Sequence, residues 1–110
     1  MRPAQRTMAK LRSEGWIVDK VEHYNSHSRR RVDLYNFIDL LCICPNRGVL
    51  AVQCCGRDFT WHRKKILAEK RAFICLQAGI KIEIWGWRKL KAGWRSRVEE
   101  IDIDSEWTCS

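Results

Sequence analysis

Apolar and polar residues alternate along the chain in patterns that are typical of both helices and strands. The segment Pro3–Ser13 holds Met8 and Leu11 among good helix formers, and Gly15 then closes it as glycine often closes a helix. The next segment, Trp16–Tyr24, is rich in β-branched and aromatic residues and partly alternates, which favours a strand. The chain is therefore predicted to begin with a helix followed by a strand.

Two long apolar runs predict a hairpin after a polar, basic loop at Asn25–Arg31. The runs Leu34–Cys44 and Val49–Cys55 flank the segment Pro45–Gly48, whose residues favour a turn. Because apolar residues are nearly continuous in both runs, we expect central strands that are covered on both faces.

The remaining chain predicts one more helix and two more strands. Apolar residues recur at helical spacing over Phe59–Ala78, and Gly79 ends that helix. The segment Ile80–Trp87 alternates strictly at first and is the clearest strand of the chain. Arg97–Ile103 carries alternate charges, as an edge strand does, and an acidic tail at about 104–110 is expected to fray. The pattern predicts an α/β fold in which helices cover a central sheet.

Composition narrows the class of protein. The 110 residues suit one domain, 1–110, with a single modest core. Lysine and arginine total 21 against 13 acids, which gives a net charge of +8 and a sequence pI near 9.5. This surplus points to an anionic polymer, and nucleic acid is the first candidate. Because we find no signal peptide and no apolar run near the roughly 18 residues that span a bilayer, we expect a cytoplasmic protein without membrane contact.

The basic residues gather in clusters, whereas five of the acids lie between Glu99 and Glu106. A solvated surface explains any single cluster as well as binding does, but several clusters on one small domain favour a binding track. A basic surface for RNA or for an acidic protein partner stays open as an alternative. The candidate DNA-binding residues are Arg29, Arg30, Arg31, Arg57, Arg63, Lys64 and Lys65.

Six cysteines raise the question of disulfides or a zinc site. Five of them lie inside apolar segments, where small buried thiols are common, so we interpret them as reduced core residues. Structural zinc motifs usually space their cysteines by two to four residues on turns. Adjacent Cys54 and Cys55 would instead point to opposite faces of a strand, which disfavours zinc.

The strongest candidate for chemistry is a pair of polar residues inside the predicted hairpin. Folding the chain about its turn sets Asp39 beside Gln53 to within about a residue. A carboxylate and a second oxygen ligand that are buried together suit magnesium. An unpaired aspartate between Ile38 and Leu40 would be costly, so the residue needs a partner, either a metal ion or the Gln53 amide.

The order helix, strand, hairpin, helix, strand, with an acid in the first hairpin strand and Val52-Gln53-Cys54 in the second, resembles the PD-(D/E)XK nuclease superfamily. The resemblance covers about Arg6–Trp87, and the short chain and basic loop look most like archaeal and phage Holliday-junction resolvases. It implies a restriction-endonuclease-like αβββαβ core with a mixed sheet. It also implies a homodimer that hydrolyses phosphodiester bonds of branched DNA, such as four-way junctions, with Mg²⁺ or Mn²⁺.

The resemblance assigns the metal ligands and reveals a departure. It implies that Asp39, Gln53 and the backbone carbonyl of Cys54 bind the ion. Cys55 stands where the family has a lysine that orients the attacking water, and a neutral thiol cannot supply that charge. The chain is therefore either a nuclease that uses a substitute residue or a catalytically inactive DNA-binding module on a nuclease scaffold.

Substitutes for the lysine are sought on the predicted helix after the hairpin. At about 100° per residue, with Ile66 facing the sheet, His62 and Arg63 lie near the sheet-facing side. Lys65 lies on the flank and Lys64 points nearly opposite. We therefore rank His62 first, Arg63 second and Lys65 third as replacement cation or general base. A partly buried histidine that bonds to the backbone is the simpler explanation of His62, and we favour it over a role in the site.

The acid that the family places in its first helix is also missing here. Glu22, with His23 beside it, could reach the same pocket from the preceding strand, and a solvent-facing carboxylate is the alternative. Asp33 is expected to cap or to pair with Arg29–Arg31 instead. The arginines of that loop would contact phosphates, which gives salt-dependent binding without sequence readout.

Tryptophans are abundant for so small a domain. Trp61, Trp85, Trp87 and Trp94 could stack on unpaired bases. Core packing or a dimer interface is the more common use of such residues.

Overall fold

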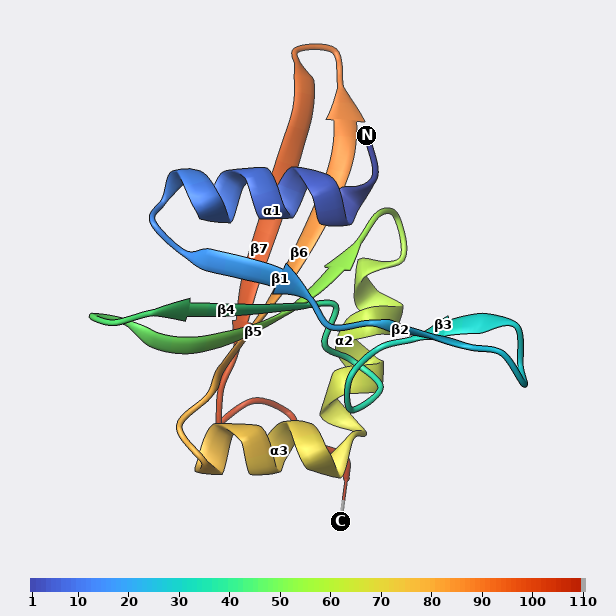
Figure 1. The fold of residues 1–110 in the computed structure, drawn as a ribbon, viewed down its shortest axis with the longest axis vertical. Coiled ribbons are helices and arrows are strands. Elements are labelled where there is room, and N and C mark those ends of the chain that lie inside the picture. Colours follow the sequence, from blue (N-terminus) through green and yellow to red (C-terminus); the bar gives the residue numbers. More distant parts are fainter. Residues whose placement is uncertain (110) are drawn as a thin grey trace.

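A five-stranded mixed sheet forms the middle layer of the computed structural model, which describes residues 1–109 (Figure 1). Its strand order is β1-β4-β5-β6-β7, and only the β5–β6 pair is parallel. The elements in chain order are α1 Pro3–Ser13, β1 Ile17–Lys20, β2 His23–Asn25, β3 Arg30–Val32, β4 Leu40–Cys44, β5 Gly48–Cys55, α2 Phe59–Leu67, α3 Lys70–Gln77, β6 Lys81–Leu90 and β7 Gly93–Ile101.

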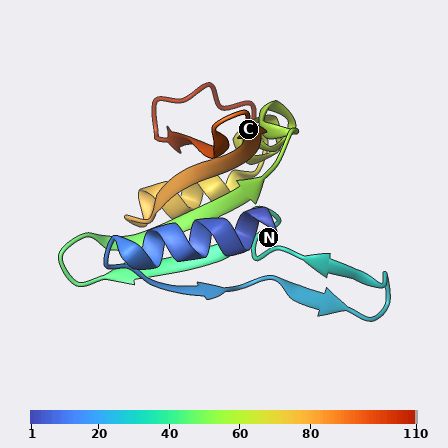
Figure 2. The same cartoon turned by 90° about the horizontal axis from the view of Figure 1, so that it is seen from above.

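Helix α1 covers one face of the sheet, as the apolar pattern predicted (Figures 1 and 2). Its Leu11 packs with Trp16, Val18, Leu40 and other buried residues of the central strands. Gly15 follows the helix with a φ of 95°, a conformation that costs glycine little. The predicted bounds of this helix are confirmed.

Helices α2 and α3 cover the other face of the sheet. Because they are two separate helices, the prediction of one continuous helix over Phe59–Ala78 is wrong. The break falls at Glu69, whose side chain accepts a hydrogen bond from Arg71 N at 3.1 Å and so caps α3. The break also leaves Leu67 O free to accept Thr108 N at 3.0 Å. The prediction of central strands that are covered on both faces is confirmed, because each face carries its own buried cluster.

Strands β2 and β3 form a separate two-stranded arm that projects from the layers (Figures 1 and 2). The predicted strand Trp16–Tyr24 is therefore interrupted, and the predicted loop Asn25–Arg31 is a hairpin tip. Asn25 Oδ1 accepts His27 N at 2.9 Å and so stabilises the turn. The predicted strand Leu34–Cys44 begins only at Leu40, because a turn precedes it.

The C-terminal hairpin is longer than predicted, and β7 is an edge strand as expected. The predicted fraying of the tail is wrong for the described residues, because Trp107 packs edge-on against Phe73 with ring centroids 5.2 Å apart. Residue 110, the last of that tail, lies outside the described residues. All six cysteines are free, and of the five that were interpreted as reduced core residues, Cys42, Cys55 and Cys75 are buried, whereas Cys44 and Cys54 are half-buried. Within residues 1–109, every helix is too short or too polar to cross a bilayer.

The close approach of α2 to β6 gives a first prediction. A Cβ atom at Gly86 would lie 2.6 Å from Cδ2 of Phe59, so Gly86→Ala should lower the free energy of unfolding by about 1–3 kcal/mol. Gly56→Ala is the control, because a Cβ there would meet nothing within 4 Å. Urea unfolding of both variants measures the difference. Equal stability of the two variants would show that Phe59 does not constrain Gly86.

Candidate metal centre

The hairpin brings Asp39 and Gln53 together, as predicted. Leu40 pairs with Val52, and Asp39 N donates to Val52 O at 2.9 Å, which fixes the register just before β4. Gln53 Nε2 then donates to Asp39 Oδ2 at 2.7 Å, and Cys54 N donates to the same oxygen at 2.7 Å. The carboxylate is therefore held by two N–H donors of β5.

The structure gives Gln53 a clear role as a partner of Asp39. Its side chain is only 1% exposed, and its amide nitrogen faces the carboxylate. The other amide atom, Oε1, is buried and has no hydrogen-bond partner in the described part of the chain. A buried oxygen without a partner is costly unless a donor or a cation reaches it. Direct metal ligation by Gln53 and by the carbonyl of Cys54 stays a prediction.

Three carboxylates meet next to this pair. Glu22, Asp33 and Asp39 each offer an oxygen, and these oxygens lie within 4.8 Å of one another. The arm brings two of these carboxylates together. Because His23 pairs with Val32, Glu22 and Asp33 lie opposite each other at the base of the arm. Val21 N donates to Asp39 O at 3.0 Å, which sets the third carboxylate beside the first. We call these three residues the acidic cluster.

Glu22 was a candidate for this pocket, and Asp33 was noted as a further acid near Asp39 but was given another role. Asp33 was expected to cap or to pair with the arginines of the loop. Instead it joins the acidic cluster, and its nearest cation is Lys65 Nζ at 3.9 Å from Oδ2. A signal existed in the sequence: Glu22 and Asp33 become neighbours once the polar segment between them is treated as a hairpin rather than as a loop.

The acidic cluster raises the pKa of its most buried member. Burial raises the pKa of Asp39 to about 8, and hydrogen bonding with Asp33 and the negative charge of Asp33 add to this effect. The Cys54 N–H lowers the same pKa, and the charge of Glu22 raises it. Three carboxylate oxygens at this spacing are the hard donors that Mg²⁺ and Mn²⁺ prefer. The residues therefore fit a divalent ion.

Two cations lie beside the acidic cluster. Arg31 Nη1 is 2.9 Å from Glu22 Oε1, and Lys65 approaches Asp33 from α2 with a side chain that is 20% exposed. A cavity of about 230 Å³ opens over Glu22 and Asp39, two members of the cluster, and Arg31 lines it as well. Arg2 and Lys20 add positive charge to its wall. An anion can thus approach the carboxylates through a basic opening.

The predicted ranking of substitutes for the missing lysine differs from the order in which these side chains contact the acidic cluster. His62 Nε2 lies 3.0 Å from Asp58 Oδ2, and burial lowers the pKa of its imidazole. Arg63 forms an ion pair with Glu99, and exposed Lys64 forms none within residues 1–109. Lys65, which we ranked third, is the only one of these residues with an ion pair to the cluster. The simpler explanation of His62 as a structural histidine fits best, with a side-chain partner in place of the backbone.

Cys55 belongs to the core. Its side chain is 4% exposed and packs in the same buried cluster as Phe59 and Ile66 of α2. Burial raises the pKa of the thiol to about 11, so it is neutral at physiological pH. The position that resembles the family's lysine therefore carries no charge.

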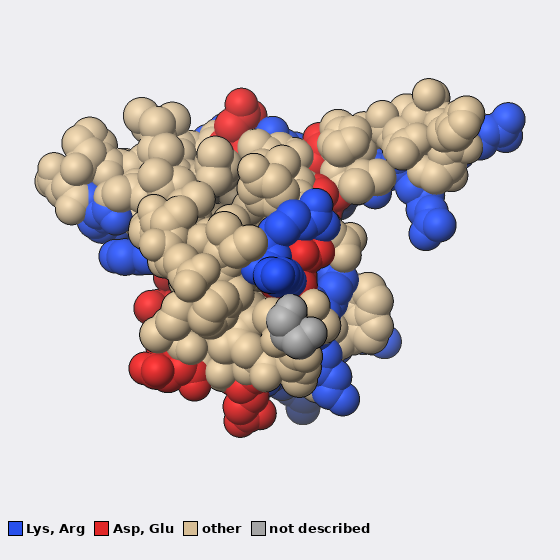
Figure 3. Space-filling model, turned by 90° about the horizontal axis from the view of Figure 1, so that it is seen from below, with Lys and Arg blue, Asp and Glu red and all other residues tan. Residues whose placement is uncertain are grey.

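The remaining basic residues divide between two surfaces. Arg29 and Arg30 lie on the projecting arm, where neither forms an ion pair with another described residue, and Figure 3 shows basic side chains, which are arginines, on this arm. Arg29 has a φ of 56° at the hairpin tip. Arg57 lies apart from the arm, in the turn after β5.

Comparisons with known proteins add nothing to this picture, because no family model, curated protein or solved structure matches the chain. The resemblance to the nuclease superfamily therefore stays a prediction from the sequence.

The raised pKa of Asp39 gives a second prediction. Between about pH 4 and pH 8 the folded protein keeps a proton on Asp39 that the unfolded chain has released, so this group lowers stability as the pH rises. Asp39→Asn should therefore raise the melting temperature more at pH 8 than at pH 5. Mn²⁺ should raise the melting temperature of the unmodified protein at pH 8 and leave that of Asp39→Asn unchanged. Thermal unfolding with and without Mn²⁺ measures both effects.

The control for this prediction is Asp19→Asn, which removes the same charge from an exposed position on β1. It should respond to Mn²⁺ as the unmodified protein does. A full response to Mn²⁺ in Asp39→Asn would show that the acidic cluster does not hold the ion.

Proposed function

We propose that this protein is a metal-dependent endonuclease that cuts branched DNA, in the manner of a Holliday-junction resolvase. The observation that carries the proposal is the acidic cluster, in which Glu22, Asp33 and Asp39 meet at the base of a basic arm. Carboxylates gathered for a divalent ion beside a cationic approach suit the hydrolysis of a phosphodiester. The cofactor would be Mg²⁺ or Mn²⁺.

The arrangement of elements supports this proposal. Without the arm, the chain runs α1, β1, β4, β5, α2–α3 and β6, which matches the order of a restriction-endonuclease-like αβββαβ core. The sheet is mixed and has helices on both faces, as that core requires. Asp39 and Gln53 also stand at the hairpin positions that the resemblance assigns to the metal site.

In this proposal the residues around the acidic cluster have separate roles. A bound divalent ion would supply a Lewis acid and an activated water. Gln53 and the Cys54 N–H orient Asp39, while Arg31 neutralises Glu22 in the absence of DNA. Lys65 would stabilise the charge that develops on the phosphate, a role supported by its Nζ, which lies 3.9 Å from Asp33 Oδ2 of the acidic cluster.

DNA would be held chiefly through its phosphates. The arm carries Arg29 and Arg30 away from the body of the protein, where they can reach a second DNA segment (Figures 1 and 3). Contacts of this kind give strong salt dependence and no sequence preference. We expect a homodimer, because a symmetric pair of sites would cut two strands of a junction.

A catalytically inactive DNA-binding module is the second candidate. The observation that favours it is the neutral, buried thiol of Cys55 at the position that resembles the lysine. This candidate predicts salt-sensitive binding without cleavage in any divalent metal. It is distinguished from the first by whether the acidic cluster and Lys65 affect a reaction or only binding.

Cleavage of a four-way junction tests the proposal directly. With Mg²⁺ or Mn²⁺ the purified protein should nick a labelled junction, and Asp39→Asn should abolish nicking because the cation loses its central ligand. Junction binding measured in EDTA should stay within about twofold, since no phosphate-contacting residue changes. Asp19→Asn is the charge-matched control and should cut normally. Nicking that persists in Asp39→Asn would remove the assignment.

The role of Lys65 is tested against its neighbour. Lys65→Met should reduce the single-turnover cleavage rate at saturating DNA by about 10²-fold, as loss of one group that stabilises developing charge does. Lys64→Met removes the same charge from an exposed position of the same helix and should leave this rate within about twofold. Equal effects of the two substitutions would show that Lys65 acts only through general charge.

A further inference from the structure

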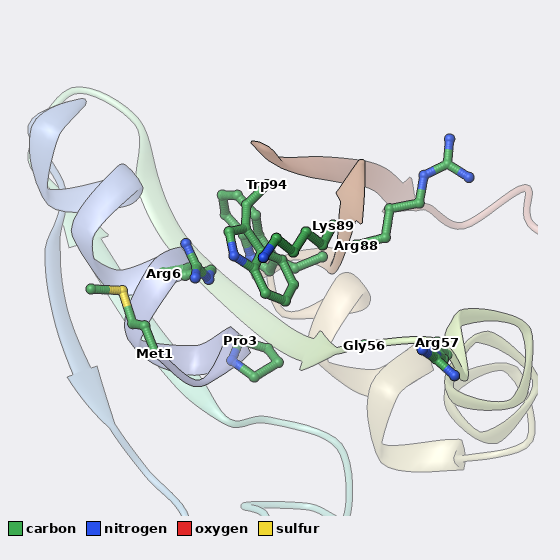
Figure 4. Close-up of a pocket in the computed structure, with 9 residues that line it drawn as sticks. Met1, Pro3, Arg6, Gly56, Arg57, Arg88, Lys89 and Trp94 are labelled. Carbon is green, nitrogen blue, oxygen red and sulfur yellow. The ribbon is translucent and has the colours of Figure 1, made fainter. Parts of the chain in front are cut away.

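Two adjoining cavities form one groove between the N-terminal end of α1, the turn after β5 and the β6–β7 hairpin. Their volumes are about 270 and 520 Å³. Both are lined by Gly56, Arg57, Trp87 and Arg88, so the two cavities adjoin one another. Figure 4 shows the first cavity, and we call the whole the aromatic groove.

The aromatic groove is strongly basic. Within residues 1–109 no aspartate or glutamate lines either cavity. Of its cations only Arg97 lies within 4.0 Å of a carboxylate oxygen of the described residues, with Nη2 4.0 Å from Glu99 Oε1. An anion would therefore meet several uncompensated charges there. The lining cations are Arg6, Arg57, Arg88, Lys89 and Arg97.

Tryptophan rings give the groove flat apolar surfaces. Trp87 Nε1 donates to Thr7 Oγ1 at 2.8 Å, which fixes that ring against α1. Trp94 is 40% exposed, and the guanidinium carbon of Arg6 lies 4.1 Å from its ring centroid. Figure 4 shows Lys89 running alongside Trp94. Exposed rings bordered by cations are the combination on which unpaired bases stack while their phosphates are neutralised.

The aromatic groove adjoins the acidic cluster. Pro3 lines both the groove and the cavity over Glu22 and Asp39. Gly56 and Arg57 directly follow β5, the strand whose Gln53 and Cys54 hold Asp39. A nucleic acid strand with one phosphate at the cluster can therefore continue into the groove across the N-terminal end of α1.

We infer that the aromatic groove holds unpaired nucleotides of the DNA strand that passes the acidic cluster. The inference rests on the proposed function and refines its substrate to branched DNA with a single-stranded segment beside the branch. Cavities of this size accept groups of nucleotide dimensions. The bases of an intact duplex are stacked on one another and cannot lie on Trp94.

Binding measured without metal tests the inference apart from catalysis. In EDTA, fluorescence anisotropy of a labelled oligothymidylate and of a blunt duplex is compared for the unmodified full chain and its variants. Trp94→Ala should weaken oligothymidylate binding about fivefold or more, as loss of one stacked base does, and change duplex binding less than about twofold. Trp94→Phe keeps an aromatic face and should retain most of the affinity.

Charge is tested with a matched pair of variants. Arg57→Glu should weaken oligothymidylate binding more than Lys70→Glu, which makes the same charge change at an exposed position of α3 outside the groove. Equal loss in these two variants, or unchanged oligothymidylate binding in Trp94→Ala, would overturn the inference.

The outcome for the groove is separable from the outcome for the nuclease. A protein that binds oligothymidylate through Trp94 and never cuts a junction would support the groove and refute the endonuclease. A protein that cuts junctions while its Trp94→Ala variant binds oligothymidylate normally would support the endonuclease and refute the role of the groove.

Discussion

The constraint on which this molecule depends is the burial of one carboxylate among others. Asp39 accepts two N–H donors from β5 through its side chain, while its backbone bonds to Val21 and to Val52. Three segments that are far apart in the sequence are thereby joined at one residue. Fixing Asp39 also brings its carboxyl group beside those of Glu22 and Asp33. Ionising all three groups is unfavourable because Asp39 is buried and like charges repel, which is why Asp39 holds its proton and why a cation would stabilise the ionised cluster.

Positive charge surrounds this acidic centre on two sides. The β2–β3 arm projects from one side, and the aromatic groove extends from the other past Pro3. The two surfaces differ in kind: the arm offers exposed point charges, whereas the groove combines charge with the rings of Trp87 and Trp94. A substrate with both a paired and an unpaired segment would use both surfaces, with the carboxylates between them.

Local sequence patterns predicted most of the fold. They failed where contacts between residues far apart in the sequence determine the bounds of an element. The period of apolar residues located α1, the central hairpin and β6, because burial against the sheet selects those positions. The same period missed the break at Glu69, since the apolar stripe continues through it. A local cap at Glu69 and the return of the tail to Leu67 stabilise that break. The arm was missed because both of its strands are polar and exposed.

For the site, the sequence by itself determined that Asp39 lies beside Gln53 to within about a residue, because a short hairpin between buried strands restricts the register. Only the tertiary structure decided which other side chains reach that pair. Asp33 arrives through closure of the arm and Lys65 through the placement of α2. Helical spacing gives the direction of a side chain but not its reach or its partner, and for this reason it favoured His62. The residue that reaches the carboxylates is Lys65, whose side chain is long and flexible.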